Sequence, residues 1–381
     1  MVCSLEAWDD VWRRNQFFVD ILLRRNPNLR VLFVEPPADV LYDLSCRRIP
    51  ALPRTRAVSD DRRLRAFRPL KVLPRRLGPL SDALLLHQVR LAARALGFLR
   101  PVLWINDVTY APLIRGTGWP SLYDVTDDWL LAPFPPHELE RLRRLDGLAL
   151  DQAHEVVVCS PALANSRGAG RSVSLIPNGV DVDHFRRPRQ RPNDLPKRPA
   201  AVYVGSLHDA RIDVELVVEL ARTLPHVSFA FVGPNSLSSR SRQLLQALPN
   251  FSLLGQRPYR DVPAYLQHAD VIVVPHRVSA FTESLDPIKV YECLAVDSPT
   301  VATAAAGFRD YPKALHVVDR NQFATRVSDV LAGPSGTHER VEPVGWRQRA
   351  LEFEEVLLLA ALRAHSPPVS RSEPDPVCLT F

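Results

Sequence analysis

The sequence predicts an α/β protein of two doubly wound domains that face a central cleft, with a C-terminal helix that closes the structure. Three observations carry this prediction: apolar runs alternate with segments of helical periodicity, the apolar runs are continuous, and one segment rich in Pro and Arg interrupts the pattern. Continuous apolar strands are typical of a parallel sheet covered by helices on both faces. At 381 residues the chain is long enough for two such cores.

The first predicted domain is 1–184. Its apolar runs predict strands at 2–5, 29–35, 102–105, 121–124 and 155–159. Apolar residues at helical spacing predict helices at 10–25, 84–99 and 136–152.

The segment 185–199 lacks periodicity and is rich in Pro and Arg, so it is predicted to be the linker. The second predicted domain is 200–345, with strands at 201–205, 227–233, 251–254, 270–275 and 299–303, and helices at 213–223, 239–248, 262–268 and 287–296. A closing helix is expected at 346–365 and a disordered tail at 366–381.

Composition narrows the class of protein. Hydrophobic residues make up 46% of the chain and charged residues 24%, as in ordinary globular proteins. The five cysteines lack metal-ligand spacing, which argues against a zinc site and a disulfide framework and favours a reducing cytosol. No apolar stretch approaches the roughly 20 residues that span a bilayer. These features predict a cytoplasmic protein, with binding to the inner face of the plasma membrane as a further possibility.

The most informative segment is 281–303. A strand at 270–275 leads through a polar loop into a helix and then a second strand, so the loop lies at the carboxyl end of the first strand. Open α/β sheets bind ligands at that edge, and a helix N-terminus there favours phosphate. Glu283, Ser284, Lys289 and Glu292 are therefore placed where a nucleotide would bind.

Two glycines, Gly205 and Gly233, end predicted strands of the second domain. Each position fits a tight turn. Each equally fits a place where the missing side chain lets a diphosphate approach the backbone N–H groups.

Several motifs resemble the GT-B glycosyltransferases, specifically family 4 and the related teichuronic-acid-type transferases. These motifs are IPNGVDVDHF at 176–185, YVGSL at 203–207, FVGP at 231–234, and the stretches 250–275 and 281–303. The resemblance implies two Rossmann-like domains and hexosyl transfer from a nucleotide-sugar donor, with no other cofactor.

The resemblance also implies roles for residues of the second domain. Glu292 matches the glutamate that accepts hydrogen bonds from the donor ribose. Where the family usually has an Arg after the first glycine, this chain has Ser206, and Arg211 stands at the position of the family's Lys. Arg211 and Lys289 would hold the diphosphate, beside Gly205 and Gly233. Gln256 and Arg257 are also expected in the donor site.

Candidates for the reacting centre come from both domains. Either Glu283 reaches the donor sugar or Ser284 contacts it, because the motif's first glutamate is displaced by one residue here. Asp124 and Asp127 lie at a strand end of the first domain, where members of the family often have a residue that contacts the donor sugar. No Asp-x-Asp triplet stands at a strand end as a metal anchor, which predicts a metal-independent enzyme. By resemblance, the transfer would retain the anomeric configuration.

The segment 47–100 carries fourteen basic residues against three acidic ones. A solvated face and a docking surface for anionic lipid are equally compatible with this imbalance. Nucleic-acid binding is disfavoured because few aromatic residues are interleaved for stacking.

These features together predict a glycosyltransferase whose acceptor is a cell-envelope glycolipid or polysaccharide precursor, lipid-linked or an oligosaccharide. Two alternatives stay open at this point: a nucleotide-sugar epimerase on the same fold, and a non-catalytic protein that binds nucleotide sugars.

Overall fold

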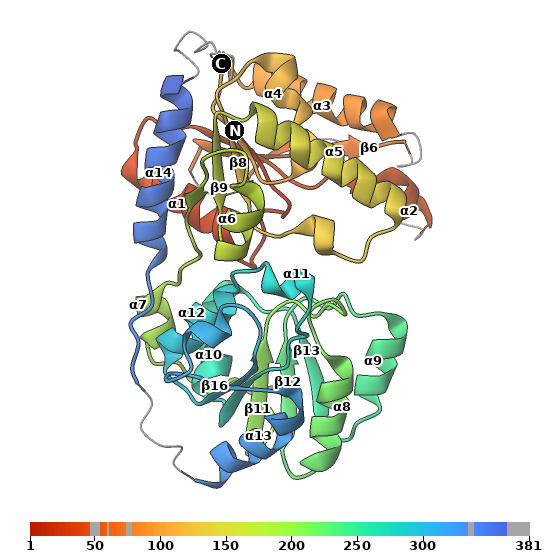
Figure 1. Ribbon diagram of the computed structural model, residues 1–381, viewed down its shortest axis with the longest axis vertical. Coiled ribbons are helices and arrows are strands. Elements are labelled where there is room, and N and C mark those ends of the chain that lie inside the picture. Colours follow the sequence, from red (N-terminus) through yellow and green to blue (C-terminus); the bar gives the residue numbers. More distant parts are fainter. Residues whose placement is uncertain (46–53, 59–60, 74–77, 334–338, 364–381) are drawn as a thin grey trace, which may run out of the picture.

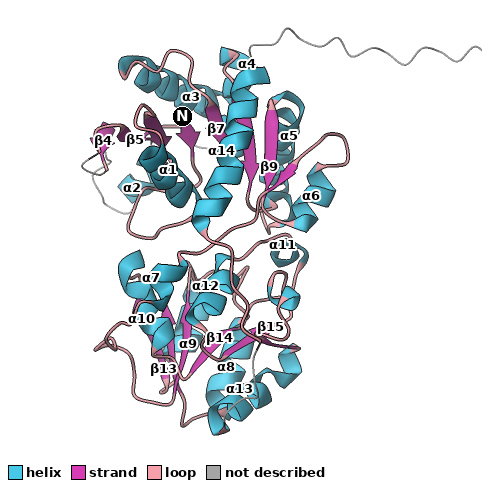
Figure 2. Ribbon diagram, turned by 90° about the vertical axis from the view of Figure 1, so that its left-hand side faces the viewer, coloured by secondary structure: helices cyan, strands magenta, loops and turns pink. Residues whose placement is uncertain are grey.

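The computed structural model describes residues 1–45, 54–58, 61–73, 78–333 and 339–363. Two α/β domains lie one above the other along the long axis of the molecule (Figure 1). The chain builds the upper domain first and then the lower one, and its last helix returns to the upper domain (Figures 1 and 2).

In the described residues of the first domain, the sheet has the order β10-β9-β8-β7-β1-β2-β5-β4, in which all neighbours are parallel except β5 and β4. Its strands are β1 (Val2–Cys3), β2 (Val31–Val34), β4 (Arg54–Ala57), β5 (Leu64–Arg68), β7 (Leu103–Ile105), β8 (Ser121–Val125), β9 (Glu155–Val158) and β10 (Ser174–Leu175). A small ribbon pairs β3 (Ala38–Asp39) with β6 (Leu70–Lys71). The helices are α1 (Arg14–Arg25), α2 (Val40–Ser45), α3 (Gly78–Ala95), α4 (Pro112–Thr117), α5 (Pro136–Gln152) and α6 (Pro161–Arg167). The next helix, α7 (Val182–Arg186), packs on the second domain against α10 and α12 (Figure 1).

The second domain has a parallel sheet of order β13-β12-β11-β14-β15-β16. Its strands are β11 (Ala200–Val204), β12 (Ser228–Val232), β13 (Phe251–Gly255), β14 (Val271–Val274), β15 (Thr300–Thr303) and β16 (His316–Val318). Its helices are α8 (Val214–Thr223), α9 (Ser239–Gln246), α10 (Val262–Gln267), α11 (Ala280–Glu283), α12 (Ile288–Val296) and α13 (Phe323–Ala332). The strand order reverses beside β11, so the carboxyl ends of β11 and β14 form the ligand-binding edge of such a sheet.

The last helix, α14 (Trp346–Arg363), packs on the first domain although it follows the second in the chain (Figure 2). Phe353 lies 4.8 Å from Phe18 of α1 and 4.5 Å from Trp104 of β7, measured between ring centroids. This helix therefore covers one face of the first sheet. The predicted tail, 366–381, lies outside the described residues, as do the last two positions of the predicted closing helix.

Most predicted elements are present with shifted ends. The first helix begins at Arg14 rather than at residue 10, because the Gln16 side chain holds the preceding loop: it accepts from Arg13 N and donates to Asp9 O. Residues 54–71, for which no strand was predicted, contribute β4, β5 and β6. The predicted linker, 185–199, packs on the second domain through buried Phe185 and Leu195.

Polar and apolar contacts join the two domains beside the cleft. Asn178 Nδ2 donates to Asp286 O at 2.6 Å, and Ser160 Oγ donates to Ser284 O at 2.6 Å. Nearby, the rings of Trp129 and Phe281 lie 5.6 Å apart. These contacts fix where the carboxyl ends of the two sheets face each other.

Candidate functional site

The site is built on two glycines at the carboxyl ends of neighbouring strands. Gly205 follows β11 with φ +147°, and Gly233 follows β12 with φ +146°. A Cβ added to Gly205 would lie 1.9 Å from Lys289 Nζ, and one added to Gly233 would lie 2.1 Å from Gly205 O. The positive φ disfavours a side chain at both positions; at Gly233 the backbone of Gly205 also excludes one, and at Gly205 a side chain would displace the Lys289 ammonium.

Two cations meet at this edge. Lys289, in the first turn of α12, donates to Val204 O and lies 4.8 Å from the centre of the Tyr203 ring. Arg211 comes from the loop after β11 and pairs with Asp127 of the first domain at 2.8 Å. Burial and the charges of Lys289 and Arg211 hold the pKa of His276 well below its usual range, so this imidazole is neutral. The edge thus concentrates positive charge beside two positions that have no side chain, an arrangement that favours phosphate.

Glu292 lies one turn beyond Lys289 on α12. Its half-buried carboxylate has no hydrogen-bond partner among the described residues, and burial raises its pKa while Lys289 opposes the rise. Tyr259 lies close enough for the charge of Glu292 to raise its pKa further, after burial. The Tyr259 hydroxyl is also buried without a partner. Two groups able to hydrogen bond are therefore free at one place, and sequence reasoning missed Tyr259.

The two candidates of the 281–303 loop have other contacts. Glu283 pairs with Arg309, while its Oε1 is buried without a partner. Ser284 is buried: its Oγ donates to Phe281 O at 2.7 Å and accepts from Asp128 N at 3.4 Å. Ser284 thus lies in the contact between the domains, and Glu283 lies at the neighbouring α11 end.

The two candidate aspartates of the first domain differ in exposure. Asp124 is fully buried; it accepts from Arg14 Nη2 at 3.3 Å and from Trp104 Nε1 at 3.2 Å. Burial raises its pKa, and both partners oppose that rise. Asp127 is partly exposed and faces the second domain through Arg211. Of the two, Asp127 is the one that the structure brings to the cleft.

Three further predicted donor contacts lie around the same sheet edge. Ser206 is exposed directly after Gly205. Gln256 is exposed after β13, and its carbonyl accepts from Arg257 Nη1 at 2.9 Å. The Arg257 guanidinium also donates to Asp194 at 2.5 Å and to Tyr265 Oη at 2.9 Å. Arg257 is therefore bound to the 185–199 segment and to α10.

Glu6, which sequence reasoning also missed, belongs to the loop between β1 and α1. Burial raises its pKa to about 7, Arg13 opposes the rise, and Asp127 and Arg211 act on it as well. Arg13 Nε lies 3.5 Å from its Oε1. A carboxyl that titrates near neutral pH thus lies beside the Asp127–Arg211 pair. No sequence signal marks it, because a single glutamate in a loop has no periodicity or motif.

The described residues hold neither a metal-binding cluster nor a membrane span. No group of three or more His, Cys, Asp or Glu side chains is placed there to hold a metal ion. Within the same residues, no helix is both long and apolar enough to cross a bilayer.

Comparisons with known proteins agree with this geometry. Residues 198–333, which carry the glycines, Lys289 and Glu292, match the family model described as "Glycosyl transferases group 1". A protein of Bacillus subtilis (strain 168) named as a teichuronic acid biosynthesis glycosyltransferase, TuaH, is 28% identical over 222 residues, covering 54% of this chain and 55% of the relative. The chain thus spans about half the length of the curated relative that it matches.

Among solved structures, an α,α-trehalose-phosphate synthase (UDP-forming) from Burkholderia vietnamiensis has a TM-score of 0.62 at 15% identity, covering 95% of this chain and 94% of that one. The E. coli trehalose-6-phosphate protein bound with UDP-2-fluoro glucose has a TM-score of 0.61 at 12% identity, covering 94% of this chain and 95% of that one. The fold is therefore GT-B, and the predicted fold class and the resemblance to glycosyltransferases are confirmed.

Proposed function

We propose that this protein is a glycosyltransferase that moves a sugar from a nucleotide-diphosphate donor to an acceptor hydroxyl. One observation carries the proposal: the Lys289 ammonium lies against Gly205 at the carboxyl edge of a parallel sheet, where no side chain fits. Arg211 adds a second cation, and Glu292 supplies an unpartnered carboxylate one turn away. This combination fits a diphosphate at the glycines and a ribose at Glu292.

The chemistry follows from the charges. During transfer the bond from the anomeric carbon to the diphosphate oxygen breaks, and a bond from that carbon to the acceptor oxygen forms. Negative charge grows on the departing diphosphate, which Lys289 and Arg211 stabilise. The acceptor proton passes to the departing phosphate oxygen, and Glu6 in its ionised form accepts a hydrogen bond that orients the acceptor hydroxyl.

We further propose that transfer retains the anomeric configuration and needs neither a metal nor another cofactor. Retention rests on the sequence resemblance. Metal independence rests on the two cations, which can neutralise the diphosphate in a metal's place. Turnover should persist in excess EDTA; activity that disappears with the chelator and returns with Mg²⁺ or Mn²⁺ would contradict this part of the proposal.

The proposed acceptor is a cell-envelope glycolipid or polysaccharide precursor, which is supported by the name of the Bacillus subtilis relative. The activity is tested by incubating the full chain with UDP-sugars first, then with other nucleotide sugars, together with saccharide acceptors, and measuring the released nucleoside diphosphate. Acceptor-dependent release that Lys289→Met abolishes supports the proposal. Conversion of the donor into a free epimer, or tight nucleotide binding without turnover in any mixture, would favour the epimerase or the binding protein instead.

We also propose that the first domain binds an anionic membrane surface from the cytoplasmic side. Five apolar side chains between 42% and 64% exposed lie on α2, on α3 or directly after β6: Leu41, Leu44, Val72, Leu80 and Leu84. We call these five the apolar face. Both helices pack against the β3–β6 ribbon, which keeps the apolar face together.

Positive charge accompanies the apolar face. Arg54 and Arg68 are exposed and directly opposite each other on β4 and β5, and Arg68 precedes β6. Like charges that face each other repel, and an anionic headgroup relieves that repulsion. By contrast, Arg56, Arg63 and Lys71 of the same basic stretch pair with Glu35, Asp61 and Asp39.

Cosedimentation with vesicles tests this proposal. Binding should need phosphatidylglycerol and weaken with salt, because exposed charges are screened over roughly 8–10 Å at physiological ionic strength. Arg54→Ser with Arg68→Ser, and separately Leu80→Ser with Leu84→Ser, should each release the protein. The control is Arg222→Ser with Arg240→Ser, an equal charge change on the second domain. Equal binding to neutral and anionic vesicles would contradict the proposal.

A further inference from the structure

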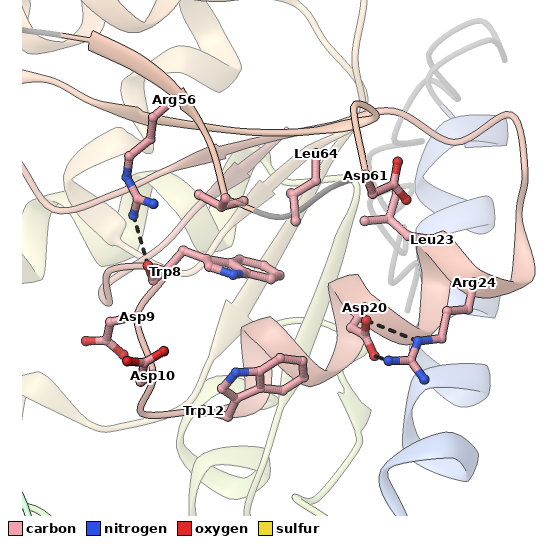
Figure 3. A pocket seen from close by; sticks show the side chains of 11 residues that line it. Trp8, Asp9, Asp10, Trp12, Asp20, Leu23, Arg24, Arg56, Asp61 and Leu64 are labelled. Atoms are coloured by element: carbon pink, nitrogen blue, oxygen red, sulfur yellow. Dashed lines mark hydrogen bonds and ion pairs between the residues drawn. The ribbon is translucent and has the colours of Figure 1, made fainter. Parts of the chain in front are cut away.

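A pocket of about 590 Å³ lies on the first domain, outside the glycine edge described above. The loop after β1, the helix α1 and the β4–β5 region form its walls, and Figure 3 shows its side chains. Trp8 and Trp12 supply its aromatic lining, and Asp9, Asp10, Asp20 and Arg56 are among its polar groups.

The two indole rings are held by packing on their outer sides. Trp8 meets Phe33 edge to face at 5.1 Å, and Trp12 stacks on Tyr259 of the second domain at 6.1 Å with an interplanar angle of 21°. The two indoles meet each other at 6.2 Å with an angle of 63°. They therefore form an angled apolar wall beside the pocket (Figure 3). The position of Trp12 in this wall depends on its contact with Tyr259 of the second domain.

The polar groups of the pocket are partly engaged and partly free. Arg56 Nη2 donates to Glu35 at 2.5 Å and to Trp8 O at 2.9 Å. Asp20 pairs with Arg24 at 2.9 Å. The carboxylate of Asp10 has no partner among the described residues, whereas its carbonyl accepts from Tyr259 N at 2.8 Å. The exposed carboxylate of Asp10 thus lies beside the aromatic wall, where it can accept hydrogen bonds from the hydroxyl groups of a ligand.

We propose that this pocket is a saccharide subsite that binds the part of the acceptor remote from the reacting hydroxyl. A pyranose has an apolar C–H face and a rim of hydroxyls. The face fits an indole, and the rim fits carboxylates and guanidinium groups. The inference rests on the proposed function for the identity of the ligand, whereas the pocket itself is lined by residues of the first domain.

The position of the pocket agrees with this role. Glu6, on whose pKa Asp127 and Arg211 act, is two residues before Trp8 in the same loop, so the Cα atoms of Glu6 and Trp8 are at most about 7 Å apart. An acceptor held at Glu6 would therefore lie near the pocket.

The charges of the pocket select among saccharides. Four aspartates line it, and arginines pair with three of them, Asp9, Asp20 and Asp61, so the charge of Asp10 stays uncompensated. Uronates and phosphate groups would meet net negative charge, which disfavours them. The structure therefore favours a neutral or amino-bearing stretch of saccharide in this pocket.

The test is a titration of the full chain followed by tryptophan fluorescence and by ligand-observed NMR. The probes are the tetramers of N-acetylglucosamine, glucosamine and galacturonate, with tetralysine as a cationic peptide. We expect the first two saccharides to bind with dissociation constants on the order of 1 mM and the galacturonate tetramer not to bind. Tryptophan signals should change with the two sugars that bind.

Two variants make the test specific. Trp8→Ala should weaken saccharide binding about tenfold or more, and Asp10→Asn should weaken it severalfold, since it removes a charged acceptor and leaves every core contact in place. Asp151→Asn, an exposed change at the end of α5, is the control. UDP affinity, measured in parallel, should be unchanged in all three.

Several outcomes would overturn the inference. Saccharide binding that survives both Trp8→Ala and Asp10→Asn, or a galacturonate tetramer that binds best, would remove the subsite. Tetralysine binding more tightly than any sugar would make the pocket a peptide site. If UDP binds and no tetramer does, the subsite fails and the proposed function stands; if the sugars bind and no nucleotide does, the proposed function fails.

Discussion

The two domains use their charged residues in opposite ways. The first domain buries complete ion pairs: Arg14–Asp124 and Arg167–Asp128 have side chains that are all less than a tenth exposed. Among the described residues of the second domain, no ion pair is buried to that degree. Instead, Glu292 lies half-buried without a partner in a domain whose core is apolar.

This difference separates charges that hold the structure from charges that bind a ligand. Asp124 is at a strand end, as a catalytic carboxylate would be, but its two oxygens accept from Arg14 and Trp104. Glu292 also carries a carboxylate, but no described residue donates a hydrogen bond to it. A carboxylate is therefore a good candidate for ligand binding when burial leaves it unpartnered, because desolvation without a hydrogen bond is unfavourable until a ligand arrives.

The largest effect should follow from breaking the buried pair of the first domain. Arg14→Met leaves Asp124 buried without its cation and also removes the Arg14 bonds to Pro177 O and Asn178. We expect the free energy of unfolding to fall by about 3–5 kcal/mol, measured by urea denaturation. Arg24→Met on the same helix is the control, because Arg24 is 76% exposed and its pair contributes at most about 1 kcal/mol. If Arg14→Met and Arg24→Met lowered the free energy of unfolding equally, the proposed difference between the domains would be contradicted.

A smaller effect on stability, with a larger effect on binding, is expected at Gly205. Gly205→Ala forces a side chain onto Lys289 and strains the backbone, which costs about 1–3 kcal/mol of folding free energy. Nucleotide binding, followed by calorimetry, should be lost because the ammonium must leave its place. Gly147→Ala in α5 is the control: its Cβ meets nothing within 4 Å, and the change should stabilise by about 0.5–1 kcal/mol. Retained nucleotide affinity in Gly205→Ala would show that the diphosphate binds elsewhere.

The smallest expected effect is a pH dependence that originates in the first domain. The pKa of Glu6 is raised to about 7, so its carboxyl is protonated below that pH and ionised above it. Because the ionised form orients the acceptor, the transfer rate should rise as the pH increases through 7. At one pH unit below the pKa, the rate should be about tenfold lower than on the plateau at high pH. Burial is the main cause of this raised pKa; Arg13 and Arg211 lower it, and Asp127 and Asp9 raise it further. Glu6→Gln should flatten the acidic limb of the rate profile; an unchanged limb would assign it to another group.

The sequence is more informative for the second domain than for the first. Periodic helices are predicted nearly to the residue in both domains, as α5 and α8 show. In the second domain the residue pattern alone also reveals the apolar strand, polar loop and helix around Lys289 and Glu292. By contrast, β5 carries Arg65 and Arg68 among its apolar residues, and its register depends on pairing with β2, which is a tertiary contact. Tyr259 could not be found because its hydroxyl is buried by packing between domains, and Glu6 because its pKa is raised chiefly by burial in the folded chain.

The central claim is that the carboxylate of Glu292, which has no partner among the described residues, binds the ribose of the donor. Isothermal titration of UDP, or of whichever nucleoside diphosphate binds best, into the wild type and Glu292→Gln tests it directly. We expect the affinity to fall by about 1–3 kcal/mol, or roughly 5- to 150-fold, with the fold intact. Glu219→Gln, an exposed change in the same domain, should bind like the wild type. A Glu292→Gln variant that also binds the nucleotide like the wild type would contradict the account.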